Sequence, residues 1–380
     1  MHDAPPEAAQ QVRNGDDASA VDPELKRIVA RAVPGARVLS ALTLGADLES
    51  DARQATAKSA GYGVPIRIDV ELQGERRSLV LHGTSANDFG HDRRADRAAE
   101  LLLAADTFAS IPRHVRALEV GVFTDDGVSV PLSNTGEFYL LTDYAPGRAY
   151  AEDLRAISRS GAASSRDFDR MHTLVDYLAE LHSSVQGRPA AYARSLRDLL
   201  GSGEGIFGIV DAYQAAPQSS LCRSLRGIER RCLEWRWRLK AHLPRATRIH
   251  GDFHPFNVLF DEPSDLHVLD TSRGSIGDPA DDVSCMAVNY VFFAIEDAAS
   301  WRAAFAPLWR EFWSRYLAQT KDRELLSVAA PFLAWRLLVL ACPVWYPNLS
   351  AAARARLLSF ADAVLAAERF DPSMAEAVFA

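Results

Sequence analysis

The sequence has few cysteines, and no two of them are spaced as C-x-x-C. The 380 residues include four, which are Cys222, Cys232, Cys285 and Cys342. Zinc ribbons and redox dithiols need closely spaced pairs, so this distribution excludes both kinds of site. We interpret the four side chains as free thiols in a reducing compartment, which favours a cytoplasmic protein.

The sequence also lacks an excess of basic residues and a long apolar run. Its 42 Lys and Arg residues against 50 Asp and Glu residues give a net charge of −8, which excludes a general nucleic-acid binder. The most apolar stretch, 328–345, is short for a membrane span and contains Arg336 and two prolines, so it predicts a buried core helix. Residues 1–17 show no basic segment followed by an apolar one, so no secretory signal is expected.

What is present indicates a globular chain with two lobes. A hydrophobic content of 48% and a charged content of 24% are typical of a folded protein, and 380 residues suggest two domains. We predict an α+β fold with a disordered tail over 1–21, rich in Ala, Pro, Asp and Gln. A small sheet-rich N-lobe is expected over 22–143 and a large, mainly helical C-lobe over 144–380.

The first part of the chain shows the patterns of a sheet with one inserted helix. Asp22 and Pro23 form an N-cap followed by proline at the first helical position, so a short helix is expected through Val33. Another helix is expected over 93–108. Alternating apolar residues bounded by turn residues predict strands near 38–44 and over 67–72, 78–81 and 137–142.

After Gly147 the pattern changes to helix. Apolar residues over 168–185 recur at the i, i+3, i+4, i+7 spacing of a buried amphipathic helix, which includes His182 as a core histidine. One strand–turn–strand segment, 258–269, interrupts the helical part. Further helices are expected near 220–242, 284–318, 323–341 and 350–368.

The interrupting segment carries the residues with chemical potential. If 258–269 folds as an antiparallel hairpin, Asn257 and Asp270 lie side by side at its open end. Asp252 lies five residues before Asn257 on the incoming loop. Carboxylate and amide oxygens are the hard ligands that magnesium prefers, so Asn257 and Asp270 are candidate metal ligands. Asp252 is then left to orient or accept the proton of an attacking hydroxyl, as in kinases.

These residues form a recognisable signature. The pattern His250-Gly-Asp-x-His-x-x-Asn257, Leu269-Asp270 and Gly277-Asp-Pro-x-x-Asp282 resembles that of the aminoglycoside phosphotransferase and choline kinase superfamily. The resemblance implies a protein-kinase-like bilobal fold, with Asp252 as the catalytic aspartate and magnesium on Asn257 and Asp270. It also implies that Asp282 bonds the backbone of the catalytic loop, and that the hinge after residue 141, including Asp143 and Ala145, binds the adenine.

One position departs from the kinase pattern. The third strand of the small lobe should carry a lysine for the phosphates, but that position falls on His82. We leave three interpretations open: His82 contacts phosphate, Lys58 in the glycine-containing segment 58–63 contacts phosphate instead, or the strand has another register or the phosphate-binding residue is missing. The acidic partner of such a residue would be Asp96 or Glu100.

Other polar residues near the motif have simpler interpretations. We expect His250 and His254 to brace the loop, and Arg273 to form a structural ion pair, with a phosphate contact as the alternative. A zinc hydrolase built on His250, Asp252 and His254 is a further alternative, but it would give Asn257 no role.

The sequence thus predicts a magnesium-dependent kinase. It would transfer the γ-phosphoryl group of ATP, or of GTP as an alternative donor, to a hydroxyl of a small molecule such as an aminoglycoside-like antibiotic, a sugar or an amino alcohol. Residues 150–245 and 285–370 would form the acceptor pocket. The alternative is a catalytically silent, kinase-like binding protein. We expect no nucleic-acid or membrane partner, and the sequence gives no indication of the oligomeric state.

Overall fold

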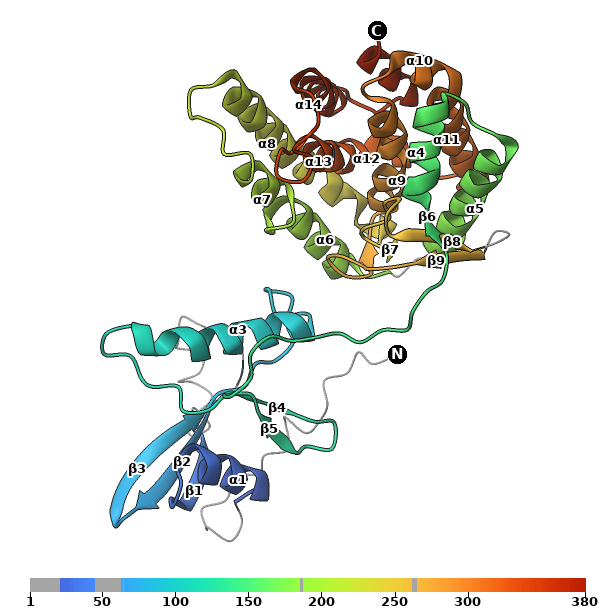
Figure 1. Cartoon of the computed structure of the whole chain (residues 1–380). Helices are drawn as coiled ribbons and strands as arrows, with labels where there is room; N and C mark the ends of the chain where they lie inside the picture. Colours follow the sequence, from blue (N-terminus) through green and yellow to red (C-terminus); the bar gives the residue numbers. More distant parts are fainter. Residues whose placement is uncertain (1–20, 45–62, 64, 185–186, 262–264) are drawn as a thin grey trace. The chain divides into compact units, whose positions relative to one another are not determined.

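The computed structural model describes residues 21–44, 63, 65–184, 187–261 and 265–380 (Figure 1). The chain forms two compact units that divide between Leu141 and Thr142. The predicted tail over 1–21 lies outside the described residues apart from Val21, which is buried in the first unit. Lys58 and the rest of the glycine-containing segment 58–63, apart from Gly63, lie outside them as well.

The first unit is built on a three-stranded antiparallel sheet. Its strands are β1 (Arg37–Thr43), β2 (Ile66–Leu72) and β3 (Glu75–Leu81), in the order β1-β2-β3. Gln73 and Gly74 connect β2 to β3 with φ angles of 53° and 81°, the left-handed pair that a tight hairpin turn requires. The predicted strands over 67–72 and 78–81 are therefore confirmed, with β3 beginning three residues earlier than expected.

Helix α1 (Pro23–Ala32) covers this sheet. The Asp22 side chain accepts a hydrogen bond from the backbone N–H of Glu24 at 2.7 Å, which caps the helix as the sequence predicts. The apolar face of α1 packs on the inward residues of the strands, and this small core contains Val21, Leu25, Val29, Val38, Ala41, Ile68 and Val70.

The rest of the first unit comprises α3 (Arg94–Thr107), a 3-10 turn (Phe108–Ser110) and the hairpin of β4 (Gly121–Phe123) and β5 (Ser129–Pro131). The predicted strand over 137–142 is wrong, because the structure has no strand there. Its alternating apolar residues remain exposed, Tyr139 by 93%, rather than packing on a core. Alternation predicts a strand only where a neighbouring strand and a core are available to it.

The second unit is mainly helical. Its α-helices are α4 (Tyr150–Ser160), α5 (Ser165–His182), α6 (Pro189–Gly201), α7 (Ile206–Asp211), α8 (Ser220–Leu239), α9 (Ala280–Ala294), α10 (Ala298–Ser300), α11 (Ala306–Thr320), α12 (Leu325–Val328), α13 (Ala330–Ala341) and α14 (Ala351–Ala366). Tighter or wider turns complete it, namely the 3-10 turns Lys240–Arg245 and Pro372–Val378 and the π turn Trp301–Phe305.

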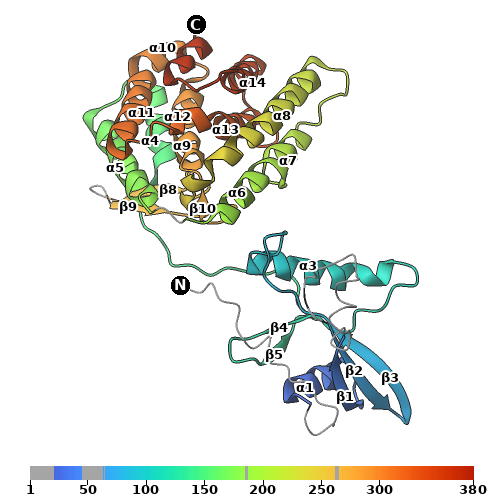
Figure 2. The same ribbon diagram turned by 180° about the vertical axis from the view of Figure 1, so that it is seen from behind.

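Helix α13 lies in the interior of this unit, in contact with α7, α8, α9 and α14 (Figures 1 and 2). All but one of its residues are buried, which confirms the core helix predicted from the apolar stretch 328–345. Its single charged residue, Arg336, is buried with the rest. None of the helices in the described ranges has the length and hydropathy needed to cross a membrane.

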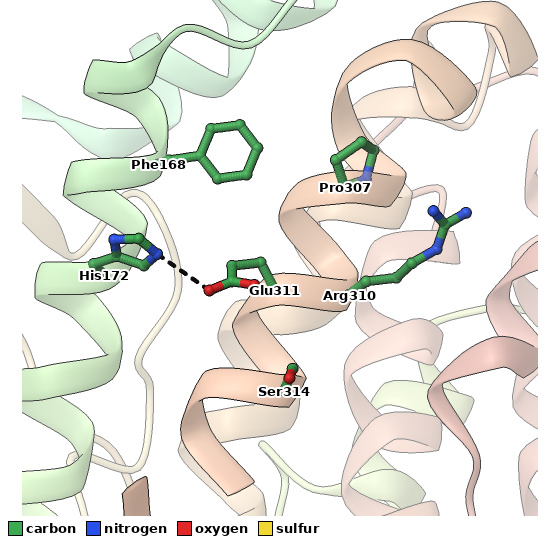
Figure 3. Close-up of a pocket in the computed structure, with 6 residues that line it drawn as sticks. All are labelled: Phe168, His172, Pro307, Arg310, Glu311 and Ser314. Atoms are coloured by element: carbon green, nitrogen blue, oxygen red, sulfur yellow. Dashed lines mark ion pairs between the residues drawn. The ribbon is translucent and has the colours of Figure 1, made fainter. Parts of the chain in front are cut away.

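The predicted long helix over 284–318 is interrupted. Helix α9 ends at Ala294, and the Asp297 side chain then accepts a hydrogen bond from the N–H of Ala299 at 2.9 Å to start α10. A short polar side chain that bonds nearby backbone groups favours a new N-cap over continued helix. Helix α11 follows and packs beside α5, and a shallow pocket between them is lined by Phe168, His172, Pro307, Arg310, Glu311 and Ser314 (Figure 3).

Short strands lie at one end of the second unit, near the ends of α5 and α6 (Figures 1 and 2). Strands β6 (Arg148–Ala149), β8 (Val258–Asp261) and β9 (Asp265–Val268) form one antiparallel sheet. Strands β7 (Thr247–Arg248) and β10 (Ile276–Gly277) form another. The two sheets hold the loop that follows β7 and the loop that follows β9.

Candidate active site

The hairpin predicted over 258–269 is present and sets the geometry of the site. In its register Val258 faces Val268, and the N–H of Leu269 donates to the carbonyl of Asn257 at 2.8 Å, which extends the ladder beyond the strands. Asn257 and Leu269 are therefore partners at the open end, and Asp270 follows directly. The exposed Asp270 has a φ of 45°, an uncommon conformation for a residue other than glycine.

The segment before α4 is tied to the same hairpin. Gly147 has a φ of 114°, and a Cβ atom there would lie 2.8 Å from the carbonyl group of Phe260 in β8. The backbone N–H of Ala151, in the first turn of α4, donates to the carbonyl of Pro255 at 3.0 Å. Glycine at position 147 thus allows β6 to pair with β8, and α4 begins against the loop that precedes Asn257.

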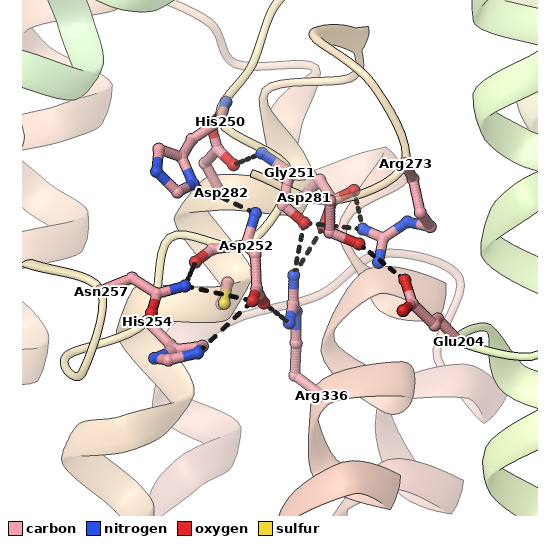
Figure 4. A network of polar contacts seen from close by, with 12 residues as sticks. Glu204, His250, Gly251, Asp252, His254, Asn257, Arg273, Asp281, Asp282 and Arg336 are labelled. Carbon is pink, nitrogen blue, oxygen red and sulfur yellow. Dashed lines mark hydrogen bonds and ion pairs between the residues drawn. The ribbon is translucent and has the colours of Figure 1, made fainter. Parts of the chain in front are cut away.

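Asp282, in the first turn of α9, holds the loop that precedes Asn257. Its carboxylate accepts hydrogen bonds from the N–H of His250 at 2.7 Å and of Gly251 at 2.8 Å (Figure 4). His182 Nε2 lies 3.2 Å from the same carboxylate. Burial alone would raise the pKa of Asp282, but His182 and the two backbone N–H groups outweigh it and lower that pKa. The predicted loop-bonding role of Asp282 and the core position of His182 are both confirmed.

Gly251 is the residue that lets two loops meet. It has a φ of 82°, and a Cβ atom at this position would lie 2.3 Å from the carbonyl oxygen of Ser272. Any side chain would clash with that backbone and strain its own. The loop that carries Asp252 and the loop that follows Asp270 therefore approach each other directly.

The carboxylate of Asp252 is surrounded by N–H donors. Oδ1 lies 2.6 Å from Arg336 Nη1, and Oδ2 lies 3.2 Å from Asn257 Nδ2 and 3.4 Å from His254 Nε2 (Figure 4). Burial alone would raise the pKa of Asp252, but the hydrogen bond from His254 and the charge of Arg336 hold this pKa well below its usual range. Asp252 is therefore ionised at any physiological pH.

The two histidines brace the loop, as predicted, and their tautomers follow from their partners. His254 Nδ1 accepts a hydrogen bond from the N–H of Phe256 at 3.1 Å, so in the neutral ring the proton is on Nε2, which faces Asp252. His250 Nδ1 accepts from the N–H of Asp252 at 3.3 Å. A neutral imidazole has only one nitrogen with a free lone pair, and in each of these rings that lone pair accepts a backbone hydrogen bond. No lone pair is then left to bind zinc, which disfavours the zinc-hydrolase alternative.

A cluster of charges beneath the loop was not predicted as part of the site. Asp281 lies between Arg273, at 2.7 Å, and Arg336, at 3.4 Å, and both guanidinium groups donate to the carbonyl of Gly251. Both also lie over the ring of Trp335, at 3.9 and 3.6 Å from its centroid. The structural ion pair expected for Arg273 is confirmed. Arg336 was noted in the sequence only as an interruption, yet one charge in an apolar helix was the signal that could have identified it.

The remaining predicted residues lie elsewhere. His82, in the first unit, directly follows β3 and is exposed. Asp96 caps α3 by accepting from the N–H of Arg93, and Glu100 pairs with His91 at 2.8 Å. Asp143 and Ala145 lie in the extended segment before β6 and are not in regular structure. The structure therefore brings together Asp252 and Asn257, places Asp270 at the same hairpin end, and leaves Lys58 outside the described residues.

The oxygen donors at the hairpin end fit a hard cation. Asn257 directs its NH2 group toward Asp252, so its amide oxygen faces away from that carboxylate and remains available. Asp270 directly follows Leu269, the residue paired with Asn257, so its carboxylate belongs to the same end of the hairpin. Over the ranges that the structure describes, no three His, Cys, Asp or Glu side chains are grouped to hold a metal ion by themselves. A magnesium ion that shares its coordination with a substrate phosphate needs only one or two protein ligands.

Comparison with known proteins places the chain in a family. The sequence model of the phosphotransferase enzyme family (APH) matches residues 80–324, which is more than half of the chain. No curated protein matches the sequence.

Similar solved structures include a glucosamine kinase, with 17% identity and a TM-score of 0.41 over 92% of this chain and 98% of that chain. A choline kinase from Streptococcus pneumoniae has 12% identity and a TM-score of 0.34 over 90% and 97%. An ADP-bound aminoglycoside phosphotransferase has 12% identity and a TM-score of 0.29 over 90% and 98%. These TM-scores are low, so the family assignment depends on the match of the sequence model. The predicted α+β class agrees with the helices and antiparallel sheets of the structure. The chain belongs to the phosphotransferase enzyme family.

Proposed function

We propose that this protein transfers the γ-phosphoryl group of ATP to a hydroxyl group of a small molecule. The observation that carries the proposal is the Asp252 carboxylate, which is held ionised and in contact with Asn257 at the open end of the β8–β9 hairpin. Phosphoryl transfer depends on positioning and on charge stabilisation more than on covalent chemistry. A fixed carboxylate beside a pair of oxygen ligands supplies both requirements.

Asp252 is assigned to the acceptor hydroxyl. Its low pKa makes it a weak base, so it acts chiefly as a hydrogen-bond acceptor that directs the hydroxyl oxygen at the γ-phosphorus. The hydroxyl oxygen forms a bond to phosphorus while the bond to the β,γ-bridging oxygen breaks. ADP and a phosphate monoester result. As the new P–O bond forms, the hydroxyl proton becomes acidic, passes to the Asp252 carboxylate and is released from there to solvent.

Asn257 and Asp270 would hold magnesium. The bound ion would neutralise the negative charge of the phosphate oxygens. Asn257 then has two tasks, because its NH2 group donates to Asp252 while its carbonyl oxygen would bind the ion. It would link the position of the metal to the position of the attacking hydroxyl.

The nucleotide is assigned to the first unit and the segment that follows it. His82 or Lys58 would contact the phosphates, and backbone groups at Asp143 and Ala145 would bind the adenine. GTP is the alternative donor. The acceptor is a small alcohol, for which an aminoglycoside-like antibiotic, a sugar and an amino alcohol are the candidates, and neither a nucleic acid nor a membrane is proposed as a partner. The four cysteines of the chain are unpaired, in keeping with action in the cytoplasm.

One observation favours a second candidate function. By the strand pattern of the sequence, His82 occupies the position expected for the phosphate-binding lysine of a kinase, and its side chain is exposed directly after β3. A protein without a phosphate clamp could bind a nucleotide or another ligand without turnover. The second candidate is therefore a catalytically silent member of the family.

A thermal-shift titration separates these functions without knowledge of the acceptor. Wild type and Asp270→Asn are titrated with ATP, with and without magnesium, and then with GTP. A ligand at 100 times its Kd stabilises a fold by about 2.7 kcal/mol, which is readily measured. We expect a magnesium-dependent shift in wild type that is lost in Asp270→Asn. No shift with either nucleotide would favour the silent binding protein.

A further inference from the structure

Arg336 is a buried charge without an obvious structural purpose. It is the only charged residue of α13, and its side chain is 8% exposed. An aliphatic residue would suit the surrounding core, because desolvation of a guanidinium group is costly unless its N–H groups are bonded. The donors of Arg336 are directed at the candidate catalytic loop, so its partners indicate what it does.

The two terminal nitrogens of the Arg336 guanidinium group form a fork that binds the side chain of Asp252 and the backbone carbonyl of the residue before it, Gly251. Nη1 lies 2.6 Å from Oδ1 of Asp252, and Nη2 lies 2.9 Å from the carbonyl oxygen of Gly251. One planar group thus restrains the carboxylate of Asp252 and the peptide that leads into it. A lysine has a single ammonium on a flexible stem and cannot reproduce this pair of bonds in a fixed plane.

The guanidinium group is itself held in place. Its Cζ atom lies 3.6 Å from the centroid of the Trp335 ring, and Nη2 also lies 3.4 Å from Asp281. Asp281 in turn binds Arg273, which donates to the same Gly251 carbonyl at 3.0 Å (Figure 4). Arg336 Nε is buried without a hydrogen-bond partner in the described part of the chain. The guanidinium group therefore leaves one of its own donors unsatisfied while its two Nη groups bond to Asp252 and Gly251.

We propose that Arg336 is a positioning residue that fixes the orientation of the Asp252 carboxylate toward the acceptor hydroxyl. This inference rests on the proposed function, since it assigns a task to a residue that acts through Asp252. It predicts that loss of the fork lowers turnover and leaves the affinity for ATP unchanged, because Arg336 contacts neither of the candidate metal ligands Asn257 and Asp270.

The test compares three variants by ATP turnover, nucleotide affinity and thermal stability. Arg336→Met removes the charge, and Arg336→Lys keeps the charge without the fork. Arg170→Met is the matched control, because Arg170 is also buried, is paired with the buried Asp153, and lies over an aromatic ring, that of Phe260. All three variants are expected to lose stability, so stability alone does not identify the role.

The expected result is a split between rate and affinity. A misplacement of about 1 Å can cost about 100-fold in rate, so we expect kcat to fall by about that factor in Arg336→Met and by about 10-fold in Arg336→Lys. The Kd for Mg-ATP should stay within about twofold in both, and Arg170→Met should keep the wild-type kcat. Wild-type kcat in folded Arg336→Met, or an equal loss of kcat and affinity, would overturn the proposal. If Arg336→Met does not fold, Arg336→Lys decides in the same way.

Crystal structures of the wild type and both Arg336 variants provide a readout that needs no turnover. The proposal predicts that the Asp252 carboxylate takes another rotamer, or several, in each variant while the backbone of 250–257 stays in place. An unchanged Asp252 side chain would contradict it. If the wild type neither binds nor turns over nucleotides, the proposed phosphotransferase function fails, and the Asp252 rotamer still decides whether Arg336 positions this side chain.

Discussion

Replacement of Asp282 by asparagine tests how the candidate catalytic loop is held. The substitution keeps the shape of the side chain and removes its charge. In the wild type, Oδ2 accepts from the N–H of His250 and lies near His182 Nε2, while Oδ1 accepts from the N–H of Gly251. An amide has one acceptor atom, so its NH2 group must face at least one of these donors.

The expected loss of unfolding free energy follows from the amide orientation that gives up the fewest hydrogen bonds. If the amide NH2 group faces Gly251, one charge-assisted hydrogen bond is lost and the bonds at the other oxygen lose their charge. A hydrogen bond to a charged group contributes about 1.5–3 kcal/mol, so we expect Asp282→Asn to lower the free energy of unfolding by about 3 kcal/mol. Asp282 is fully buried, so water cannot replace the missing acceptor.

Tryptophan fluorescence during urea unfolding measures this change in the second unit alone, because all seven tryptophans follow residue 142. With an m-value of about 3 kcal/mol per M, the midpoint should fall by about 1 M. The folded-state pKa of Asp282 is lowered, so its contribution is complete above the unfolded-state pKa of about 3.9 and is lost as the pH falls through the folded-state value. The difference between wild type and variant should therefore be constant near neutral pH and shrink below about pH 4.

Asp297→Asn is the control in the same unit. Asp297 is exposed and caps α10 through the N–H of Ala299, and asparagine caps helices about as well as aspartate. The control should therefore unfold within about 0.5 kcal/mol of the wild type. If Asp282→Asn also unfolds within that range, the carboxylate does not hold the loop and the reasoning from its three contacts is refuted.

Two further variants test separate features. Gly251→Ala should cost at least about 2 kcal/mol in the same urea assay, because its Cβ would meet the Ser272 carbonyl at 2.3 Å with φ at 82°, and an unchanged midpoint would contradict the close approach of the two loops. His82→Ala should weaken ATP binding, measured by calorimetry, if this histidine replaces the usual lysine, whereas unchanged affinity would transfer that role to Lys58.

The sequence was sufficient to predict the hairpin and the residues around it. Turn residues between two short apolar runs predicted β8 and β9, and the spacing of Asp252, Asn257 and Asp270 placed them at one end. These features are local, because each depends on residues a few positions apart. The bond from Asp282 to the catalytic loop spans a longer distance in sequence, and it was predicted through the resemblance to a family and not from spacing.

The errors and omissions concern long-range contacts. The alternation over 137–142 predicted a strand, but a strand needs a partner that its own residues do not specify. Arg336 reaches Asp252 across 84 positions in the sequence, and no periodicity in α13 indicates that contact. A single charge in an apolar helix shows that some partner exists, and only the packing of α13 against α9 and the loop shows which one.

The most direct test of the central proposal is transfer of radiolabelled γ-phosphate from ATP, with magnesium, to a mixture of small hydroxyl compounds and to water. The nucleotide affinity of each protein is measured in parallel. Wild type should transfer the label, and Asp252→Ala should lower the rate by at least about 1,000-fold while binding Mg-ATP with nearly unchanged affinity. Equal rates in wild type and Asp252→Ala would contradict the assignment of Asp252, and no transfer by the wild type despite tight binding would favour the silent family member.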